Sequence, residues 1–403
     1  MKQILSELEP SIDANSIIEL KERVNILCAR FLGGAWKNIS VQELIIQRLR
    51  GGMSNMLFLC KLPSKIVPIR NEPDKVLLRI YFNPETESHL VDESVIFTLL
   101  SERHLGPKLY GVFNGGRLEE YIPSRPLSCS EISMKQMSNK IARRIARIHC
   151  LELPIWKEPD YICDTMQRWL TQIMETPSGS HLFTVPDIYC PWAPKEVSCT
   201  QLGDEIEFLK CCINMTKSPC VFCHNDLQEG NILLLNTNYG NIRQSSIDDD
   251  FSSESSSNEF NLDDPHLVLI DFEYASYNYR GFDFANHFIE YTIDYSFNTY
   301  PFYEINNDNF PSIQQQIEFF ESYIQESEPN LSSDEIRERA LAMTEETLPF
   351  VAVSHLFWAI WSFLQVEVSP IDFGFAEYGL DRLGLYFANR KHLKNLLTNN
   401  NQK

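Results

Sequence analysis

The segment that decides the fold reads Val221-Phe-Cys-His-Asn-Asp226-Leu-Gln-Glu-Gly-Asn231-Ile-Leu-Leu234. An apolar strand leads into a polar loop, and a second apolar strand leaves it. Asp226 and Asn231 stand five positions apart on this loop. This is the H-x-D-x-x-x-x-N spacing of phosphoryl-transfer sites, in which the Asp engages the acceptor hydroxyl and the Asn binds a metal ion. For His224 we prefer a structural role, as a hydrogen-bonded residue that holds the loop, over that of a general base.

A second segment, Leu267-Val-Leu-Ile-Asp271-Phe-Glu-Tyr274, is a buried strand that ends in an exposed carboxylate. An Asp in this place can hold the Mg²⁺ that bridges the β- and γ-phosphates of ATP. Between the two segments, residues 245–264 carry seven acids and no Lys or Arg, which predicts a disordered loop. Without that loop, a short hairpin can join the strands. A lone Asp after a strand is usually a turn residue. Two strand-loop segments with Asp226 and Asp271 in this order favour a phosphoryl-transfer site instead.

The residues before this region alternate between strand and helix patterns. A helix is expected over 15–32, and another over 85–105 that stops at Gly106-Pro107. Strands are expected at 44–50, 56–62, 75–81, 108–112 and 117–122. From Glu131 onward the pattern is mainly helical, apart from a β-rich island at 220–274. The chain is therefore predicted to be an α+β protein of two lobes, a small β-rich one over 1–123 and a larger, mainly helical one over 124–403.

The small lobe offers residues that could hold a nucleotide. Arg50-Gly-Gly-Met-Ser-Asn-Met56 is a glycine-containing hairpin turn whose backbone N–H groups can approach phosphates, although a plain β-turn is the commoner cause of such a sequence. Arg79 in the third strand and Glu93 in the following helix occupy the places of the kinase Lys–Glu ion pair. The always-charged fork of an arginine can also bind phosphate oxygens.

Composition excludes several classes of protein. With 35 Lys and Arg against 55 Asp and Glu, the net charge is −20, which argues against a nucleic-acid binder and is compatible with a cationic substrate. Neither G-x-x-x-x-G-K-[ST] nor G-x-G-x-x-G occurs, so Walker and Rossmann chemistry are unsupported. The apolar window 348–366 is interrupted by polar residues, which favours a buried helix over a transmembrane segment.

Other local matches have simpler explanations. The eleven cysteines and the absence of an N-terminal secretory signal predict reduced thiols in a reducing compartment. Cys220-Val-Phe-Cys223-His224 matches a haem-attachment pattern, but core cysteines in a strand are the better interpretation. Asp372-Phe-Gly374 spells the magnesium tripeptide of protein kinases, yet it follows no strand.

Taken together, His224–Asn231, Ile270–Asp283 and Asn286-His-Phe closely resemble the choline/ethanolamine kinase family. The resemblance extends from about Trp36 to Phe387 and is strongest to the choline kinases of animals. It implies a protein-kinase-like two-lobe fold, MgATP as phosphoryl donor, and formation of phosphocholine in the first step of phosphatidylcholine synthesis. It also implies a cytosolic homodimer, and ethanolamine is accepted by many members.

The resemblance implies a role for each matching residue. Asp226 orients the choline hydroxyl, and Asn231 and Asp271 hold magnesium. The ATP-binding residues are Arg50, Gly51, Gly52, Met53, Ser54, Asn55, Met56, Arg79, Glu93, Glu120, Tyr121, Ile122, Arg125 and Gln228. The choline-binding residues are Tyr274, Glu290, Tyr295, Trp358, Trp361, Phe373 and Tyr378. Choline has no N–H, so its trimethylammonium must be recognised by aromatic faces and carboxylates. On sequence alone, aromatic residues at helical spacing, such as Trp358 and Trp361, more often belong to the hydrophobic core than to a ligand-binding site.

Two alternatives remain beside a choline kinase. An ethanolamine-preferring kinase would need fewer aromatic residues in its substrate pocket, because a primary ammonium donates hydrogen bonds. Trp358 and Trp361 therefore argue against this alternative. An inactive choline-binding scaffold predicts the loss of Asp226, Asn231 or Asp271, and all three are present. A protein kinase is not supported, since no Ala-Pro-Glu segment follows Asp271.

Overall fold

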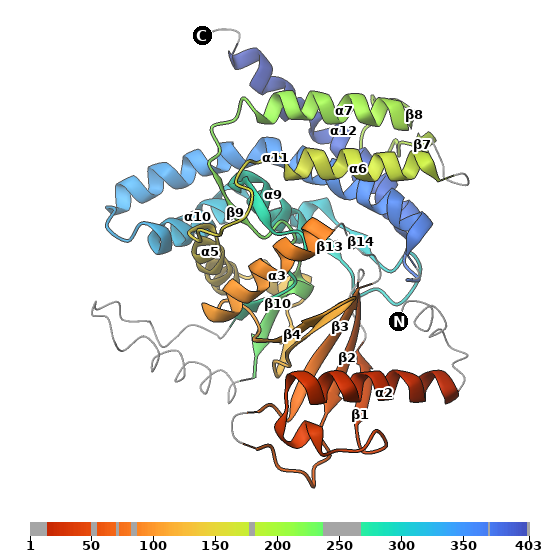
Figure 1. Ribbon diagram of the computed structural model, residues 1–403. Coiled ribbons are helices and arrows are strands. Elements are labelled where there is room, and N and C mark those ends of the chain that lie inside the picture. Colours follow the sequence, from red (N-terminus) through yellow and green to blue (C-terminus); the bar gives the residue numbers. More distant parts are fainter. Residues whose placement is uncertain are drawn as a thin grey trace. The chain divides into compact units, whose positions relative to one another are not determined.

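The computed structural model describes residues 14–49, 55–69, 72–81, 87–176, 182–236, 267–369 and 371–400. These residues form two compact units (Figure 1). The first unit extends to Arg125 and includes Leu235, and the second holds Pro126–Leu234 together with the described residues from 267 onward. The acidic segment 245–264, predicted to be a disordered loop, lies outside the described residues.

The first unit is built on a five-stranded antiparallel sheet with the order β1-β2-β3-β5-β4. Its strands are β1 (Ile45–Leu49), β2 (Asn55–Lys61), β3 (Lys75–Tyr81), β4 (Leu109–Phe113) and β5 (Gly116–Glu120). Its helices are α2 (Ala14–Phe31), the 3₁₀ turn η1 (Gly34–Lys37) and α3 (Glu87–Glu102). All seven elements that the sequence predicted here are therefore confirmed, and η1 is an addition. The β4–β5 turn needs Gly115, whose φ is 91°.

The core of this unit follows from strand alternation. Phe58 and Cys60 of β2 and Val76 and Leu78 of β3 stand two positions apart, so each pair points to one face of the sheet, and all four side chains belong to one apolar cluster. Helix α2 and Trp36 pack against these side chains.

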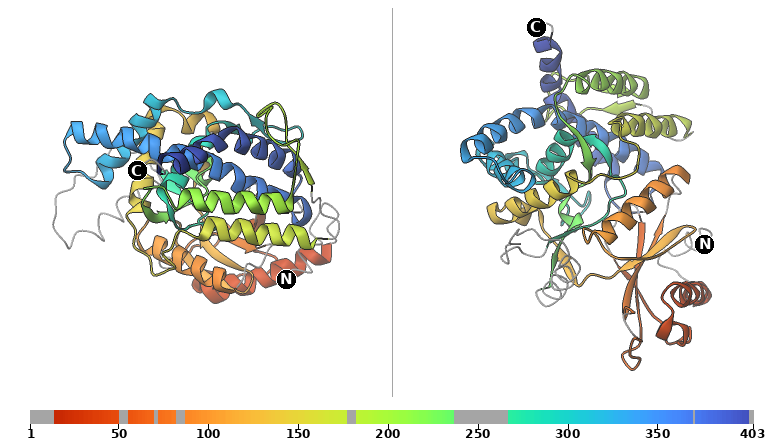
Figure 2. Two further views of the ribbon diagram at one scale, coloured as in Figure 1. Left: turned by 90° about the horizontal axis from the view of Figure 1, so that it is seen from above. Right: turned by 60° about the vertical axis from the view of Figure 1, so that its left-hand side comes forward.

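The second unit is mainly helical, as predicted. Its helices are α4 (Cys129–Ile132), α5 (Lys135–His149), α6 (Tyr161–Glu175), α7 (Cys199–Ile213), α9 (Arg280–Glu290), α10 (Ile313–Ser327), α11 (Ser333–Val368) and α12 (Phe375–Asn400), with 3₁₀ turns η2 (Glu229–Asn231) and η3 (Asn307–Asn309). Its strands are β7 (Leu182–Thr184), β8 (Glu196–Ser198), β9 (Cys220–Cys223), β10 (Ile232–Leu235), β11 (Leu267–Leu269), β12 (Ser276–Tyr279), β13 (Ile293–Asp294) and β14 (Glu304–Ile305), while β6 (Ser124–Pro126) spans the boundary. Figure 2 shows α6 and α7 running alongside each other.

Helix α11 forms the centre of this unit and contacts α12, α9, α10 and α6. By length and composition it could cross a membrane, but 94% of its most apolar window is buried among the described residues. The prediction of a buried core helix is therefore confirmed. Its first turn is fixed by a capping box in which Ser332 and Glu335 satisfy each other's backbone N–H groups.

Two antiparallel pairs frame the polar loop 224–231. Strand β9, which precedes the loop, pairs with β12, and β10, which follows it, pairs with β11. The hairpin expected between the two chemical segments is thus observed as β10–β11. Cys223 is buried, as expected for a core cysteine, but Cys220 is exposed, so the core interpretation is wrong for Cys220.

Candidate active site

The loop 224–231 has an unusual backbone where it begins. Asn225 has a φ of 66° and Asp271, after β11, a φ of 65°, which makes them two of the four described non-glycine residues with positive φ. Asn and Asp tolerate this left-handed conformation better than most residues. Strained backbone of this kind clusters at functional sites, where the surrounding structure holds it in place.

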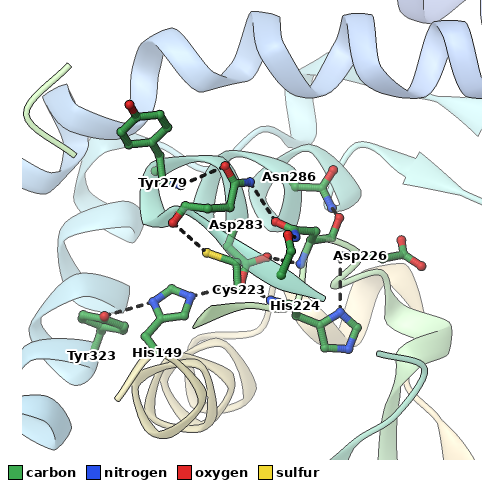
Figure 3. A network of polar contacts seen from close by, with 12 residues as sticks. His149, Cys223, His224, Asp226, Tyr279, Asp283, Asn286 and Tyr323 are labelled. Atoms are coloured by element: carbon green, nitrogen blue, oxygen red, sulfur yellow. Dashed lines mark hydrogen bonds and ion pairs between the residues drawn. The ribbon is translucent and has the colours of Figure 1, made fainter. Parts of the chain in front are cut away.

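Asp283 supplies that support from the first turn of α9 (Figure 3). It is fully buried, and its two carboxylate oxygens accept hydrogen bonds from the backbone N–H groups of His224 (2.9 Å) and Asn225 (2.7 Å). His149 Nε2 lies 3.0 Å from the same carboxylate. Burial alone would raise the pKa of Asp283, but the contacts with His149 and His224 outweigh it and lower that pKa. Asp283 is therefore an ionised anchor for the loop.

The contacts of His224 agree with the structural role expected for it. Burial lowers the pKa of this fully buried imidazole, which keeps it neutral. Its Nε2 lies 2.9 Å from the carbonyl oxygen of Ile270, and its Nδ1 accepts a 3.3 Å hydrogen bond from the N–H of Asp226. His224 thus ties the loop to the residue before Asp271.

Asp226 is half-buried at the middle of the loop and is bonded to Asn231. Asn231 Nδ2 donates to both the carboxylate (2.9 Å) and the carbonyl (2.9 Å) of Asp226. Burial raises the pKa of Asp226 well above its usual range, and the negative charges of Glu290, Asp271 and Glu273 add to this effect. So many acidic groups close together make the site one that favours a cation.

Asn231 and Asp271, the predicted magnesium ligands, are brought together by the β10–β11 hairpin. Ile232 pairs with Leu269, and the N–H of Ile270 donates to the carbonyl of Asn231 (3.0 Å). Because Nδ2 of Asn231 is used on Asp226, its Oδ1 is the amide atom left for a cation. Amide and carboxylate oxygens are the ligand types that Mg²⁺ prefers, so the residues present fit that ion.

The predicted choline-binding aromatics form two groups. In the first, the Trp358 ring centroid lies 5.3 Å from that of Tyr274 and 5.4 Å from that of Trp361, and Trp361 Nε1 donates to the Tyr274 hydroxyl (2.9 Å). In the second, the hydroxyls of Tyr295 and Tyr378 are 2.9 Å apart and Phe373 packs on both rings. Phe375 contacts Trp361 and Phe373, and so connects the two groups.

Asn286 joins the first aromatic group to the loop. Its Oδ1 accepts hydrogen bonds from Trp358 Nε1 (2.7 Å) and Ser354 Oγ (2.8 Å), and its Nδ2 donates to the carbonyl of Asn225 (3.3 Å). Asn286 lies on α9 next to the anchor Asp283 (Figure 3). The aromatic residues and Asp226 therefore share one buried framework.

Glu290, the last residue of α9, is the one carboxylate among the predicted choline-binding residues, and it is 3% exposed. Burial raises its pKa to about 7, while Arg382 and Tyr295 act in the opposite direction. Its Oε1 lies 3.8 Å from Arg382 Nη1. Sequence reasoning did not single out Arg382, although its position four residues after Tyr378 places both side chains on one face of a helix.

The first unit holds most of the predicted nucleotide residues. Glu93 forms an ion pair with Arg117, a residue that the sequence analysis did not name. Arg117 also binds Glu119 (2.8 Å), and Glu119 lies 3.5 Å from Arg79 Nε. Arg79 and Arg117 face each other across β3 and β5. Glu93, expected to pair with Arg79, thus pairs with Arg117, and Arg79 is linked to that pair through Glu119.

The remaining nucleotide residues are spread over both units. Asn55 and Met56 begin β2, Glu120 ends β5 and accepts a hydrogen bond from the N–H of Lys108 (3.0 Å), and Arg125 lies in β6. Tyr121 and Ile122 directly follow β5, and Gln228 precedes η2 in the second unit. Residues 50–54 lie outside the described part of the chain.

Comparisons with known proteins agree on one family. The family model for choline/ethanolamine kinase matches residues 46–387. The chain is 60% identical over 397 residues to choline kinase A2 of Caenorhabditis elegans, covering 98% of this chain and 92% of that protein. It is 40% identical over 374 residues to the choline/ethanolamine kinase of Rattus norvegicus, covering 92% and 86%.

Solved structures support the fold. A choline kinase from Cryptosporidium parvum superposes with a TM-score of 0.68 at 20% identity, over 94% of this chain and 98% of the other. A Plasmodium vivax ethanolamine kinase gives 0.64 at 23% identity, over 94% and 96%. The predicted protein-kinase-like α+β fold and the family resemblance are thereby confirmed. The chain belongs to the choline/ethanolamine kinase family.

Proposed function

We propose that the chain transfers the γ-phosphoryl group of ATP to the hydroxyl of choline and so forms phosphocholine. The observation that carries this proposal is the hydrogen-bonded path from Trp358 through Asn286 to the carbonyl of Asn225, the residue before Asp226. Asp226 is also close enough to the aromatic groups to add to the raised pKa values of Tyr274 and Tyr378, for both of which burial is the largest cause. The aromatic residues suited to the trimethylammonium of choline and the carboxylate suited to its hydroxyl thus belong to one site.

In this proposal the protein works by positioning. Asp226 accepts a hydrogen bond from the choline hydroxyl, which aims that oxygen at the γ-phosphorus, and the loop anchors hold Asp226 at that place. As the new O–P bond forms and the bond from the γ-phosphorus to ADP breaks, Asp226 takes the hydroxyl proton. The faces of Tyr274, Trp358 and Trp361 and the carboxylate of Glu290 bind the trimethylammonium. Asn231 and Asp271 would hold Mg²⁺, which when bound neutralises charge on the transferred phosphoryl group.

The nucleotide residues keep their predicted roles. In the first unit, Arg79 would bind phosphate oxygens, and the Arg117–Glu93–Glu119 network would fix the Arg79 side chain. Residues 50–56, the segment Glu120–Arg125 and Gln228 are proposed to bind the rest of ATP on the family resemblance. A cytosolic homodimer, and a place in the first step of phosphatidylcholine synthesis, are proposed on the family resemblance alone. Sedimentation of the purified protein tests the dimer.

The test compares three acceptors under identical conditions: choline, ethanolamine and the neutral isostere 3,3-dimethylbutan-1-ol. We expect kcat/KM to be highest for choline, because only choline combines a charge with a surface of methyl groups. The neutral alcohol should lose about 2 kcal/mol of binding, or some tens-fold in affinity. Turnover of ethanolamine well above choline would instead support an ethanolamine-preferring kinase, and no turnover of either amine would support an inactive scaffold.

Replacing Trp361 by Leu is expected to raise the KM for choline by about tenfold or more, because a desolvated cation–π contact is worth about 2 kcal/mol. The KM for ethanolamine should rise less, since a primary ammonium can bind by hydrogen bonds. Steady-state kinetics with both acceptors measures the difference. The matched control is Phe350→Leu, which removes a ring of the same helix that is 1% exposed and packs on Tyr279 instead. Equal KM values for choline in both variants would make Trp361 a core residue only.

Replacing Asp283 by Asn is expected to lower kcat by about 10²-fold, because an amide group cannot accept all the hydrogen bonds that hold the loop and small misplacements cost that much. The free energy of unfolding should fall by about 1–3 kcal/mol for the donor left without a partner. Kinetics and thermal unfolding on one preparation measure both effects. Asp164→Asn, at a side chain that is 66% exposed on α6, is the control. A kcat within twofold of the parent in folded Asp283→Asn protein would contradict the anchoring role.

A further inference from the structure

Arg382 is a fully buried cation near the start of α12. Its Nη1 donates to the Tyr378 hydroxyl (3.0 Å) and lies 3.8 Å from Glu290 Oε1, and its Nη2 donates to the carbonyl (3.2 Å) and hydroxyl (3.0 Å) of Ser354. Burying a guanidinium is costly unless its partners compensate. Two of these partners, Tyr378 and Glu290, are residues proposed to bind the substrate.

The two carboxylate oxygens of Glu290 differ in their surroundings, and only Oε1 lies near Arg382. Its Oε2 is buried and has no hydrogen-bond partner within the described residues. A buried carboxylate oxygen without a donor loses solvation with no compensation, so it is expected to have a partner when the site is filled. A substrate ammonium is the partner of matching charge.

The charges around Glu290 set how easily it stays ionised. Six groups of neighbouring elements face Glu290 or lie within electrostatic range of it: Arg382 and Tyr378 of α12, Tyr295 after β13, Glu229 of η2, Asp226 of the loop and Cys129 of α4. Arg382 is the one cation among them. Arg382 lowers the pKa of Glu290 more than the hydrogen bond with Tyr295 does, so without Arg382 burial would favour the protonated, neutral form of Glu290.

Resting on the proposed function, we infer that Arg382 is a positioning residue for the cationic substrate: it favours the carboxylate form of Glu290, whose Oε2 can bind the ammonium, and it orients the Tyr378 ring. A buried cation beside a site for a cation would otherwise repel the substrate. Paired with Glu290, it instead fixes where the negative charge lies. Ser354 holds the far side of the guanidinium and also bonds Asn286, so Arg382 is anchored to the framework that carries Trp358.

The experiment measures kcat, KM for choline and KM for ATP across pH for Arg382→Gln and Arg382→Lys. With Gln, the KM for choline at neutral pH should rise about tenfold, the factor that one pKa unit represents. The KM for ATP and the turnover of 3,3-dimethylbutan-1-ol should stay near the parent values. Because Glu290 binds the ammonium only when deprotonated, kcat/KM for choline rises with pH, and in Arg382→Gln this rise should move to higher pH. With Lys the positive charge remains, so the pH midpoint should stay at the parent value.

Two further variants complete the test. Arg390→Gln removes another arginine of α12, whose Nε binds Glu205 at 2.6 Å, and should leave the KM for choline unchanged. Glu290→Gln should remove the part of the pH dependence that choline shows and 3,3-dimethylbutan-1-ol does not, and adding Arg382→Gln to it should cause little further loss, since coupled residues are not additive. If Arg382→Gln fails to fold, a shifted pH midpoint in Arg382→Lys overturns the inference.

A failure of the proposed function and a failure of the inference about Arg382 give different results. A parent protein that does not phosphorylate choline contradicts the proposed function. An active parent whose Arg382→Gln variant keeps the parent's KM and pH profile contradicts the role of Arg382 alone. Equal losses for choline and the neutral alcohol at every pH would show that Arg382 only supports the fold.

Discussion

Replacing Asp226 by Asn is expected to lower kcat by about three orders of magnitude, because a positioned carboxylate contributes roughly 10²–10⁴-fold to such a proton transfer. Asn has the same size and can keep the contact that Asn231 makes at 2.9 Å with the backbone carbonyl, so the loop should persist. An interaction made mainly in the transition state appears in kcat rather than only in KM. Steady-state kinetics at matched folded fraction measures the loss.

The control is Asp372→Asn. Asp372 belongs to the Asp-Phe-Gly sequence that spells a kinase motif, but it is exposed and precedes α12. Its variant should keep the parent kcat. A folded Asp226→Asn protein with near-normal kcat would remove the central role from Asp226.

Replacing Asp271 by Asn should lower kcat by about 10²–10³-fold, since the amide keeps only one neutral oxygen where a carboxylate would bind a hard cation and help to neutralise phosphate charge. Asn tolerates the φ of 65° at this position, so the backbone after β11 is preserved. The Mg²⁺ concentration that gives half-maximal rate should rise. A titration of activity with Mg²⁺, for parent and variant, measures both effects.

Asp294→Asn serves as the control for Asp271, because it removes a half-buried acid of the same unit that bonds the N–H of Ser296 instead (2.9 Å). It should leave the Mg²⁺ requirement unchanged. An Asp271→Asn enzyme with the parent's Mg²⁺ dependence would contradict the metal-binding role.

Local patterns were enough to predict most of the fold. The strand-like runs of residues predicted the five strands of the first sheet. The two apolar runs, and the short connection left once the acidic loop is set aside, predicted the β10–β11 hairpin that brings Asn231 beside Asp271. The short pairs β7–β8 and β13–β14 were missed, since two or three residues carry no periodic signal.

Residues that act by tertiary contact could not be predicted in the same way. Asp283 bonds His149 across 134 positions, and Trp358 bonds Asn286 across 72, so no local spacing reveals either pair. Arg117 and Arg382 read as ordinary surface charges in the sequence, yet both are buried. Their partners became evident only from the packing of α9, α11 and α12 and of β3 against β5.

The most direct test of the account is a competition between acceptors in one reaction. The purified protein receives ATP labelled at the γ-phosphoryl group, Mg²⁺, and equal concentrations of choline and ethanolamine, and the labelled products are separated and quantified. We expect phosphocholine to be the main labelled product, and Asp226→Asn protein to form almost none of it. Phosphoethanolamine as the main product, or release of labelled inorganic phosphate with no phosphorylated amine, would contradict it.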